Sequence, residues 1–138
     1  MGEDHMQIGE VAERTGLSLR TIRYYGEVGL VEPSARSKGG FRLYTGSDVD
    51  RLLLIKRMKP LDFSLDQMRD LLGALDVLEA GGGTPDERSG LLARLDSFSE
   101  VAEERCRVLR KQLDMAEEFA GRLQDQRARL EGGARDRP

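Results

Sequence analysis

The sequence predicts a mainly α-helical protein, with a winged helix-turn-helix head of four helices plus a β-hairpin wing, followed by a long coiled-coil dimerisation helix. Two short helical patterns separated by TGLS indicate the helix-turn-helix. A Gly-Gly pair at 39–40 lies between two segments of strand-like composition, as in a hairpin. Apolar residues then recur every seven positions from Leu95 to Leu130, as in a coiled coil.

Composition limits the classes of protein to consider. The chain has 138 residues, of which 38% are hydrophobic and 34% charged, which suits one modest core with solvated helices beside it. No apolar run approaches the roughly 20 residues that span a bilayer, and no charged-then-apolar leader precedes the first helix. We therefore expect a cytoplasmic protein with no membrane partner, and we expect residues 1–5 to be a tail outside the fold.

Catalytic and metal-binding groups are scarce. Cys106 is the only cysteine and His5 the only histidine, too few soft ligands for a closed zinc site within one chain. No nucleophile paired with a base and no phosphate-cradling glycine loop stands out in the sequence. We expect a protein that is not an enzyme and that holds neither metal nor cofactor.

The net charge of −3 hides an uneven distribution. Between Arg14 and Lys59 there are ten Lys and Arg residues against four Asp and Glu residues, and the rest of the chain carries the acidic excess. A basic head on an acidic body fits a protein that reads nucleic acid, whereas a solvated charged surface is the alternative.

The helix-turn-helix comes first along the chain. Residues 7–14 have apolar side chains at helical spacing, and TGLS then supplies Gly16, which can take a positive φ, and Ser18, which can cap a second helix. In that second helix Leu19 and Ile22 fall on one side. The other side is polar and carries Arg20, Arg23, Tyr24 and Glu27. A recognition helix presents such side chains to base edges and phosphates in the major groove.

A β-hairpin follows in ARSKGGFRLYT, with its tight turn at the two glycines. Alternation along the second strand places Phe41 and Leu43 on an apolar underside, and Arg42 and Tyr44 on the opposite face. The result is a hairpin with an apolar underside and a basic tip.

Two further helices complete the head. One begins at Ser47 and is stopped by Pro60, and the next is capped by Ser64. Three glycines at 81–83 then close the head.

The remaining sequence indicates one long helix. Thr84-Pro85-Asp86-Glu87 has the form of a capping box, and no further proline interrupts the helical pattern up to Leu130. Its apolar stripe needs a partner, so we expect a homodimer whose interface comprises Leu95, Phe98, Ala102, Cys106, Leu109, Leu113, Ala116, Phe119 and Leu123. The alternative is a helix that breaks near Gly90 or Gly121 and folds back on itself.

The segments QIGEVAERTGLSLRTIRYYGEVGL, GGFRLY, SDVDRLLLIKRM and DFSLDQMRDLL together resemble the MerR family of bacterial transcription regulators. The resemblance places a DNA-binding domain at 6–75, a linker at 76–84, an antiparallel coiled-coil dimerisation helix at 85–131 and a disordered tail at 132–138. It implies double-stranded promoter DNA, a second copy of the chain and RNA polymerase as partners, without identifying an effector. The expected DNA-binding residues are Ser18, Arg20, Thr21, Arg23, Tyr24, Tyr25, Arg36, Lys38, Arg42, Tyr44 and Lys59. The hairpin would act as a wing beside the recognition helix, with Arg36, Lys38 and Arg42 near the DNA backbone and Tyr44 supporting or contacting it.

The resemblance also implies a mechanism, in which the dimer binds a pseudo-palindromic operator, bends and untwists it, and realigns promoter elements for polymerase. The chain departs from the family pattern at Gly26, where an acidic residue is usual, and at the C-terminal end, where the paired cysteines or second domain of sensing members are missing. An effector-independent architectural or partner-dependent DNA-binding protein is therefore an alternative. A coiled-coil scaffold or sequestering module is another.

Single residues have alternatives too. Tyr25 could be a core aromatic, one of Arg36 and Lys38 a bystander, and Lys59 a solvated lysine. Cys106 is expected to be a small packing residue within the coiled coil, with redox sensing as the alternative.

Overall fold

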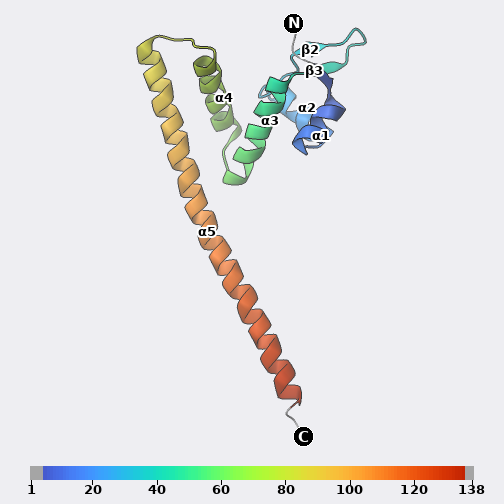
Figure 1. Cartoon of the computed structure of the whole chain (residues 1–138), viewed down its shortest axis with the longest axis vertical. Coiled ribbons are helices and arrows are strands. Elements are labelled where there is room, and N and C mark those ends of the chain that lie inside the picture. Colours follow the sequence, from blue (N-terminus) through green and yellow to red (C-terminus); the bar gives the residue numbers. More distant parts are fainter. Residues whose placement is uncertain (1–4, 136–138) are drawn as a thin grey trace. The chain divides into compact units, whose positions relative to one another are not determined.

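A computed structural model describes residues 5–135, and the expected tails at 1–4 and 136–138 lie outside the described residues. The chain divides into two compact units, the first ending at Asp96 and the second beginning at Ser97. Figure 1 shows the first unit to be a small helical domain with a short sheet, and the second to consist of one helix. No helix within the described range is both long and apolar enough to cross a membrane.

The first two helices form the helix-turn-helix that the sequence predicts. Helix α1 spans Ile8–Thr15, and helix α2 spans Leu19–Glu27. Gly16 takes the left-handed conformation at φ 72° and donates its N–H to the carbonyl of Ala12, which ends α1. Ser18 then caps α2 by accepting a hydrogen bond from the Thr21 N–H. Gly16 therefore ends the first helix and Ser18 begins the second, as predicted.

A three-stranded antiparallel sheet packs beside these helices (Figure 1). The strands β1 (Met6–Gln7), β2 (Ala35–Arg36) and β3 (Arg42–Tyr44) lie in the order β1-β3-β2. The hairpin of β2 and β3 was predicted, whereas β1 was not, and its Gln7 was expected to begin the first helix. A strand of two residues has no periodicity of its own, and β1 exists because Met6 pairs with Tyr44, far along the chain.

Helix α3 (Gly46–Met58) and helix α4 (Leu65–Glu79) complete the head. Both begin with a reciprocal capping box, Thr45 with Asp48 and Ser64 with Gln67. Helix α3 therefore starts one residue before the expected Ser47. Pro60 lies in a 3₁₀ turn, η1 (Lys59–Leu61), after which the chain reverses.

The expected linker at 76–84 is shorter in the structure. Helix α4 continues to Glu79, so residues 76–79, which were expected to belong to the linker, are helical. The turn that follows contains Gly81 and Gly83, both at positive φ.

The core of the head lies where its helices meet the sheet. Side chains with no more than 3% exposure come from α1, α2, β3, α3, α4 and the segment after α2, and include Val11, Ile22, Tyr25, Leu30, Val31, Tyr44, Leu52, Ile55 and Leu72. Three long cations also join the elements through backbone carbonyls. Lys56 donates to the carbonyl of Thr15, Arg51 to that of Leu30 and Arg69 to that of Val28. These bonds fix the turn before α2 and the segment after it.

Helix α5 spans Pro85–Arg135, a length of 51 residues, or about 77 Å at 1.5 Å per residue. The Thr84 hydroxyl accepts a hydrogen bond from the Glu87 N–H at its start, as predicted. The helix runs through Gly90 and Gly121 without a break, so the folded-back alternative is not what the structure shows. It also continues through 132–135, which were expected to be disordered.

Candidate nucleic-acid interface

Helix α2 presents a polar surface whose rotation is fixed by its start. The Ser18 hydroxyl accepts from the Thr21 N–H at 3.0 Å and donates to the Thr21 hydroxyl at 2.8 Å. Ile22 is fully buried, which leaves Arg20 and Arg23 exposed. Neither arginine forms a hydrogen bond or ion pair with any residue in 5–135. Ser18 and Thr21 thus serve the cap, while Arg20 and Arg23 are available to a ligand.

The two adjacent tyrosines have different surroundings. Their ring centroids lie 5.8 Å apart, and the ring planes are inclined at 48° to each other. Tyr24 is 45% exposed, whereas Tyr25 is only 3% exposed. Burial, and then the neighbouring Tyr24, raise the pKa of Tyr25, which keeps its hydroxyl protonated and able to donate. The buried ring agrees with the core-aromatic alternative for Tyr25. A phosphate contact through its hydroxyl stays a prediction.

The wing is built by β2, β3 and the turn between them. The Ser37 N–H donates to the Phe41 carbonyl at 2.8 Å, the Gly40 N–H donates to the Ser37 carbonyl at 2.9 Å, and Gly40 takes a φ of 82°. Arg36 stands directly opposite Arg42 in the register and donates to the Gly40 carbonyl at 3.2 Å. Lys38 is exposed in this turn. The expected basic wing is therefore present.

Two aromatic residues of the wing, Phe41 and Tyr44, have the opposite exposure to what the sequence suggested. Tyr44 is fully buried, and its hydroxyl finds no hydrogen-bond partner among the described residues, whereas Phe41 is 65% exposed. Pairing with β1 turns Tyr44 inward, because Met6 stands opposite Tyr44 and both fill the core, whereas Arg42 and Leu43 are both half-buried and Phe41 lies just before β3. Placing Tyr44 at the DNA surface is therefore wrong, and only a supporting role fits. Phe41 was not considered as a surface residue.

Arginines from α2 and the wing share one surface hollow. Arg23 lines it together with Arg36 and Arg42, in a space of about 280 Å³ whose other walls are Gln7, Ile8, Gly40 and Phe41. Like Arg23, Arg42 has no hydrogen bond or ion pair with the described residues, whereas Arg51, Arg69 and Arg94 of the same unit are each paired with an aspartate. Lone guanidinium groups gathered on one surface are suited to bind phosphates, which they can contact bidentately.

Lys59 lies apart from this hollow, exposed in the 3₁₀ turn after α3. Its role as a flanking phosphate contact stays a prediction, with solvation as the alternative. Lys56, which the charge count treated as part of the basic surface, instead donates to the Thr15 carbonyl at 2.7 Å and serves the helix-turn-helix turn.

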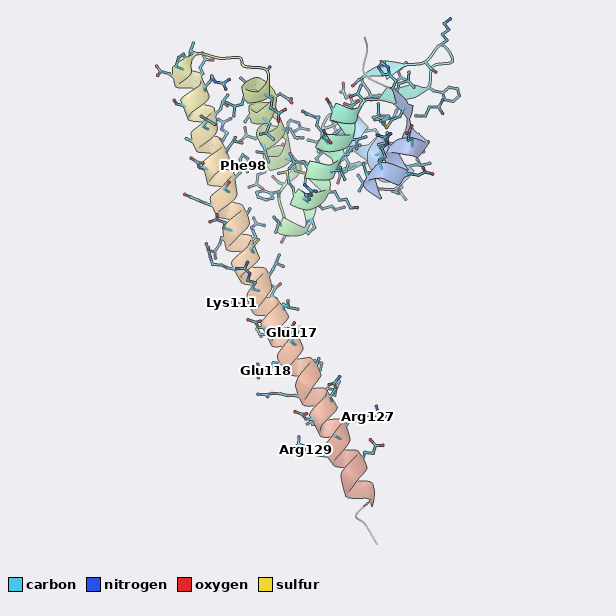
Figure 2. The ribbon with its side chains drawn as sticks, viewed as in Figure 1. Phe98, Lys111, Glu117, Glu118, Arg127 and Arg129 are labelled. Atoms are coloured by element: carbon cyan, nitrogen blue, oxygen red, sulfur yellow. The ribbon has the colours of Figure 1, made fainter. Side chains whose placement is uncertain are left out.

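Helix α5 exposes the apolar stripe that the sequence predicts. Leu109, Leu113, Phe119 and Leu123 are between 43% and 67% exposed. Cys106 is half-buried, as are Leu95, Phe98 and Ala102, while Ala116 is exposed. Charged side chains share the helix with this stripe, including those of Lys111, Glu117, Glu118, Arg127 and Arg129 (Figure 2). A contiguous apolar stripe of this length on a charged helix is typical of a surface that pairs with another helix.

Possible metal ligands do not gather in the part of the chain that the structure describes. No group of three or more His, Cys, Asp and Glu side chains there is arranged to hold a metal ion.

Comparison with known proteins agrees with this geometry. The family model of the MerR HTH family regulatory protein matches residues 6–75. The mercuric resistance operon regulatory protein of Bacillus cereus is 35% identical over 111 residues, covering 80% of this chain and 83% of that protein. The HTH-type transcriptional regulator YfmP of Bacillus subtilis (strain 168) is also 35% identical, over 130 residues, covering 92% and 89%.

Solved structures share the fold. The crystal structure of HiNmlR, a MerR family regulator lacking the sensor domain, bound to promoter DNA, superposes with a TM-score of 0.71. It covers 91% of this chain and 94% of that chain at 22% identity. A MerR family regulator from Listeria monocytogenes, with 25% identity and a TM-score of 0.58, covers 88% and 82%.

Proposed function

The chain belongs to the MerR family of helix-turn-helix regulatory proteins, and from this premise we propose that it acts as a homodimer on a pseudo-palindromic operator in promoter DNA. The family consists of DNA-binding transcription regulators, not enzymes. In the proposed complex α2 enters the major groove and the wing of β2 and β3 contacts the neighbouring backbone.

The observation that supports this proposal most directly is a set of arginines on α2 and the wing that form no ion pair with the described residues. Arg20 and Arg23 on α2 and Arg42 on β3 form no ion pair with described residues, although the same unit holds several paired arginines. The rigid cap at Ser18 and the carbonyl contacts of Arg69 and Lys56 hold α2 in one orientation. Base contacts from α2 would supply specificity, and phosphate contacts from the wing would supply affinity and register.

The exposed stripe of α5 supports the homodimer. A two-fold dimer presents two recognition helices related by symmetry, so its operator has two related half-sites. The antiparallel arrangement of the two α5 helices is the one that the family resemblance implies.

The mechanism that we propose for regulation is a deformation of the bound operator. Bending and untwisting the DNA between two half-sites changes the alignment of the promoter elements that RNA polymerase must read together. The energy for this deformation comes from the protein–DNA contacts that the deformed state permits.

Footprinting on the promoter of the protein's own gene and on those of neighbouring genes tests this function. The expected result is a protected region with two symmetric half-sites, together with increased bending in a circular-permutation gel assay. The matched control is a variant with Arg20 and Arg23 both replaced by alanine, which should give no footprint at the same concentration. If the wild-type protein protects no promoter DNA at low salt, the scaffold alternative would replace the proposal.

A further inference from the structure

Gly26 has no structural reason to be glycine. It lies in the last turn of α2, is not among the glycines at positive φ, and glycine weakens a helix relative to any ordinary residue. A Cβ added there would lie 3.5 Å from the Val31 carbonyl oxygen and 3.9 Å from Nη1 of Arg42, which are ordinary contacts. Neither backbone conformation nor packing excludes a side chain.

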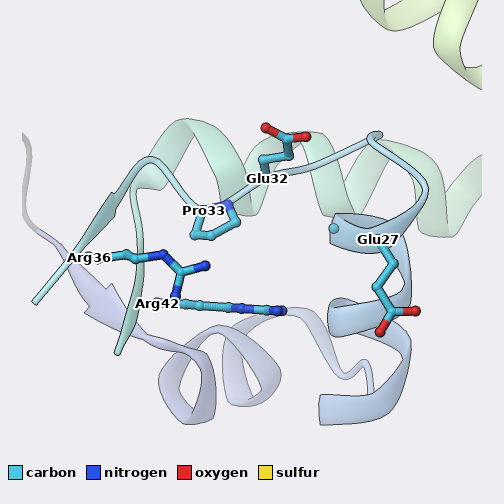
Figure 3. Close-up of a pocket in the computed structure, with 6 residues that line it drawn as sticks. Glu27, Glu32, Pro33, Arg36 and Arg42 are labelled. Atoms are coloured by element: carbon cyan, nitrogen blue, oxygen red, sulfur yellow. The ribbon is translucent and has the colours of Figure 1, made fainter. Parts of the chain in front are cut away.

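The space beside Gly26 is a hollow of about 310 Å³ between the end of α2 and the sheet. Arg36 and Arg42, opposite each other in the register, both reach into this hollow (Figure 3). Glu27 and Glu32 also line it, and the Glu32 carboxylate points away from the two guanidinium groups (Figure 3). No ion pair within 5–135 joins either glutamate to Arg36 or Arg42.

Arg36 and Arg42 repel one another and form no ion pair with a carboxylate within 5–135, so an anion placed between or beside their guanidinium groups would offset that repulsion. Such an anion could come from the protein. A carboxylate side chain growing from position 26 would start within reach of Arg42, because the added Cβ would already lie 3.9 Å from its Nη1. Because Gly26 has no side chain, the protein supplies no carboxylate to Arg42 from this position.

We propose that Gly26 increases the affinity of the wing for DNA, because the lack of a side chain there leaves the Arg42 guanidinium available to bind a phosphate of the duplex backbone. This inference rests on the proposed function, since it requires the wing to contact DNA. The inference adds a second role for α2. By having no side chain at position 26, the helix leaves Arg42 available and so contributes to DNA affinity indirectly.

Titration of operator and scrambled duplexes at several salt concentrations tests the inference. Gly26→Glu should pair with Arg42 and make the dependence of log K on log salt less steep by about 0.9 per subunit, the effect of one lost phosphate contact. Affinity for operator and scrambled DNA should fall by a similar factor. Gly26→Gln, which has the same shape without the charge, should keep the wild-type slope.

The double variant separates internal pairing from simple repulsion of DNA by a new carboxylate. If Glu at position 26 acts by occupying Arg42, then Gly26→Glu should change the slope no further in an Arg42→Ala background. An equal loss in both backgrounds would overturn the inference, as would an unchanged slope for Gly26→Glu beside a flattened one for Arg42→Ala. If Arg42→Ala itself leaves the slope unchanged, the proposed wing contact fails, and the inference fails with it.

Discussion

Lys56 of α3 donates a hydrogen bond of 2.7 Å from its Nζ to the carbonyl oxygen of Thr15, the last residue of α1. A cation at this position satisfies a carbonyl that the helix leaves free, and it is favoured by the helix dipole. The bond also passes close to Gly16, because a Cβ added to that glycine would lie 2.9 Å from the same Nζ. The third helix therefore holds the turn that orients the recognition helix.

Gly16→Ala should lower the free energy of unfolding by about 1 to 2 kcal/mol, because alanine at φ 72° is strained and its methyl group displaces Lys56. Gly26→Ala is the matched control, since its added Cβ meets only ordinary contacts in a helix, and it should raise stability by about 0.5 to 1 kcal/mol. Urea unfolding at one fixed protein concentration measures both. Equal effects of the two substitutions would contradict the assigned role of the turn.

Tyr44→Phe should leave operator affinity unchanged and leave stability equal or higher by about 1 kcal/mol. The buried Tyr44 hydroxyl has no partner among the described residues, and an unsatisfied buried donor costs about 1 to 3 kcal/mol. Tyr24→Phe is the comparison, because that side chain is 45% exposed on α2 and should lose a DNA contact without losing stability. A loss of affinity at unchanged stability for Tyr44→Phe would place its hydroxyl on the DNA after all.

Local signals in the sequence were enough to predict the helical elements. Ser18, Ser64 and Thr84 each accept a hydrogen bond at a predicted helix start, because a cap depends on residues three positions apart. The end of α4 was harder to predict, because the helix continues through Gly73 to Glu79.

The orientation of the wing could not be predicted from its own residues. Alternation separates Phe41 and Leu43 from Arg42 and Tyr44, but it does not say which face is buried. That choice depends on pairing between Met6 and Tyr44, a contact between distant parts of the chain. The same limit applies to Lys56 and Arg69, whose carbonyl partners lie on other elements and give no local signal.

Leu109→Asp should convert the dimer into a monomer, because in the proposed coiled coil it buries an unpaired carboxylate. Leu109 is 43% exposed in the isolated chain, on the stripe that needs a partner. Lys111→Asp places the same group two positions away, on an exposed residue outside the stripe, and should leave the dimer intact. Light scattering at micromolar concentration measures the mass of each. A monomeric wild-type protein would show that α5 does not pair as proposed.

Substitutions on α2 should reduce the preference for the operator sequence, whereas substitutions on the wing should reduce affinity for any DNA. Arg20 and Arg23 are exposed on α2 and have no hydrogen-bond or ion-pair partner among the described residues, so one or both should contact bases. Replacing a base-reading arginine by alanine should cost about 1 to 3 kcal/mol on the operator and relax the preference at one base pair. A phosphate-contacting arginine such as Arg42 should instead weaken operator and scrambled DNA nearly alike when replaced.

The measurement is a set of titrations of Arg20→Ala, Arg23→Ala and Arg42→Ala on operator, scrambled and single-substituted duplexes. Arg14→Ala is a suitable control, because Arg14 lies on α1 and is already paired with Glu10 at 3.0 Å. Arg14→Ala should change DNA affinity little, because Arg14 lies outside the proposed DNA-binding surface. It should also change stability little, since an exposed ion pair contributes about 0 to 1 kcal/mol. If Arg20→Ala and Arg23→Ala both bind the operator as tightly as wild type, α2 is not the helix that reads the DNA. The surface proposed above would then have to be reassigned to another face of the head.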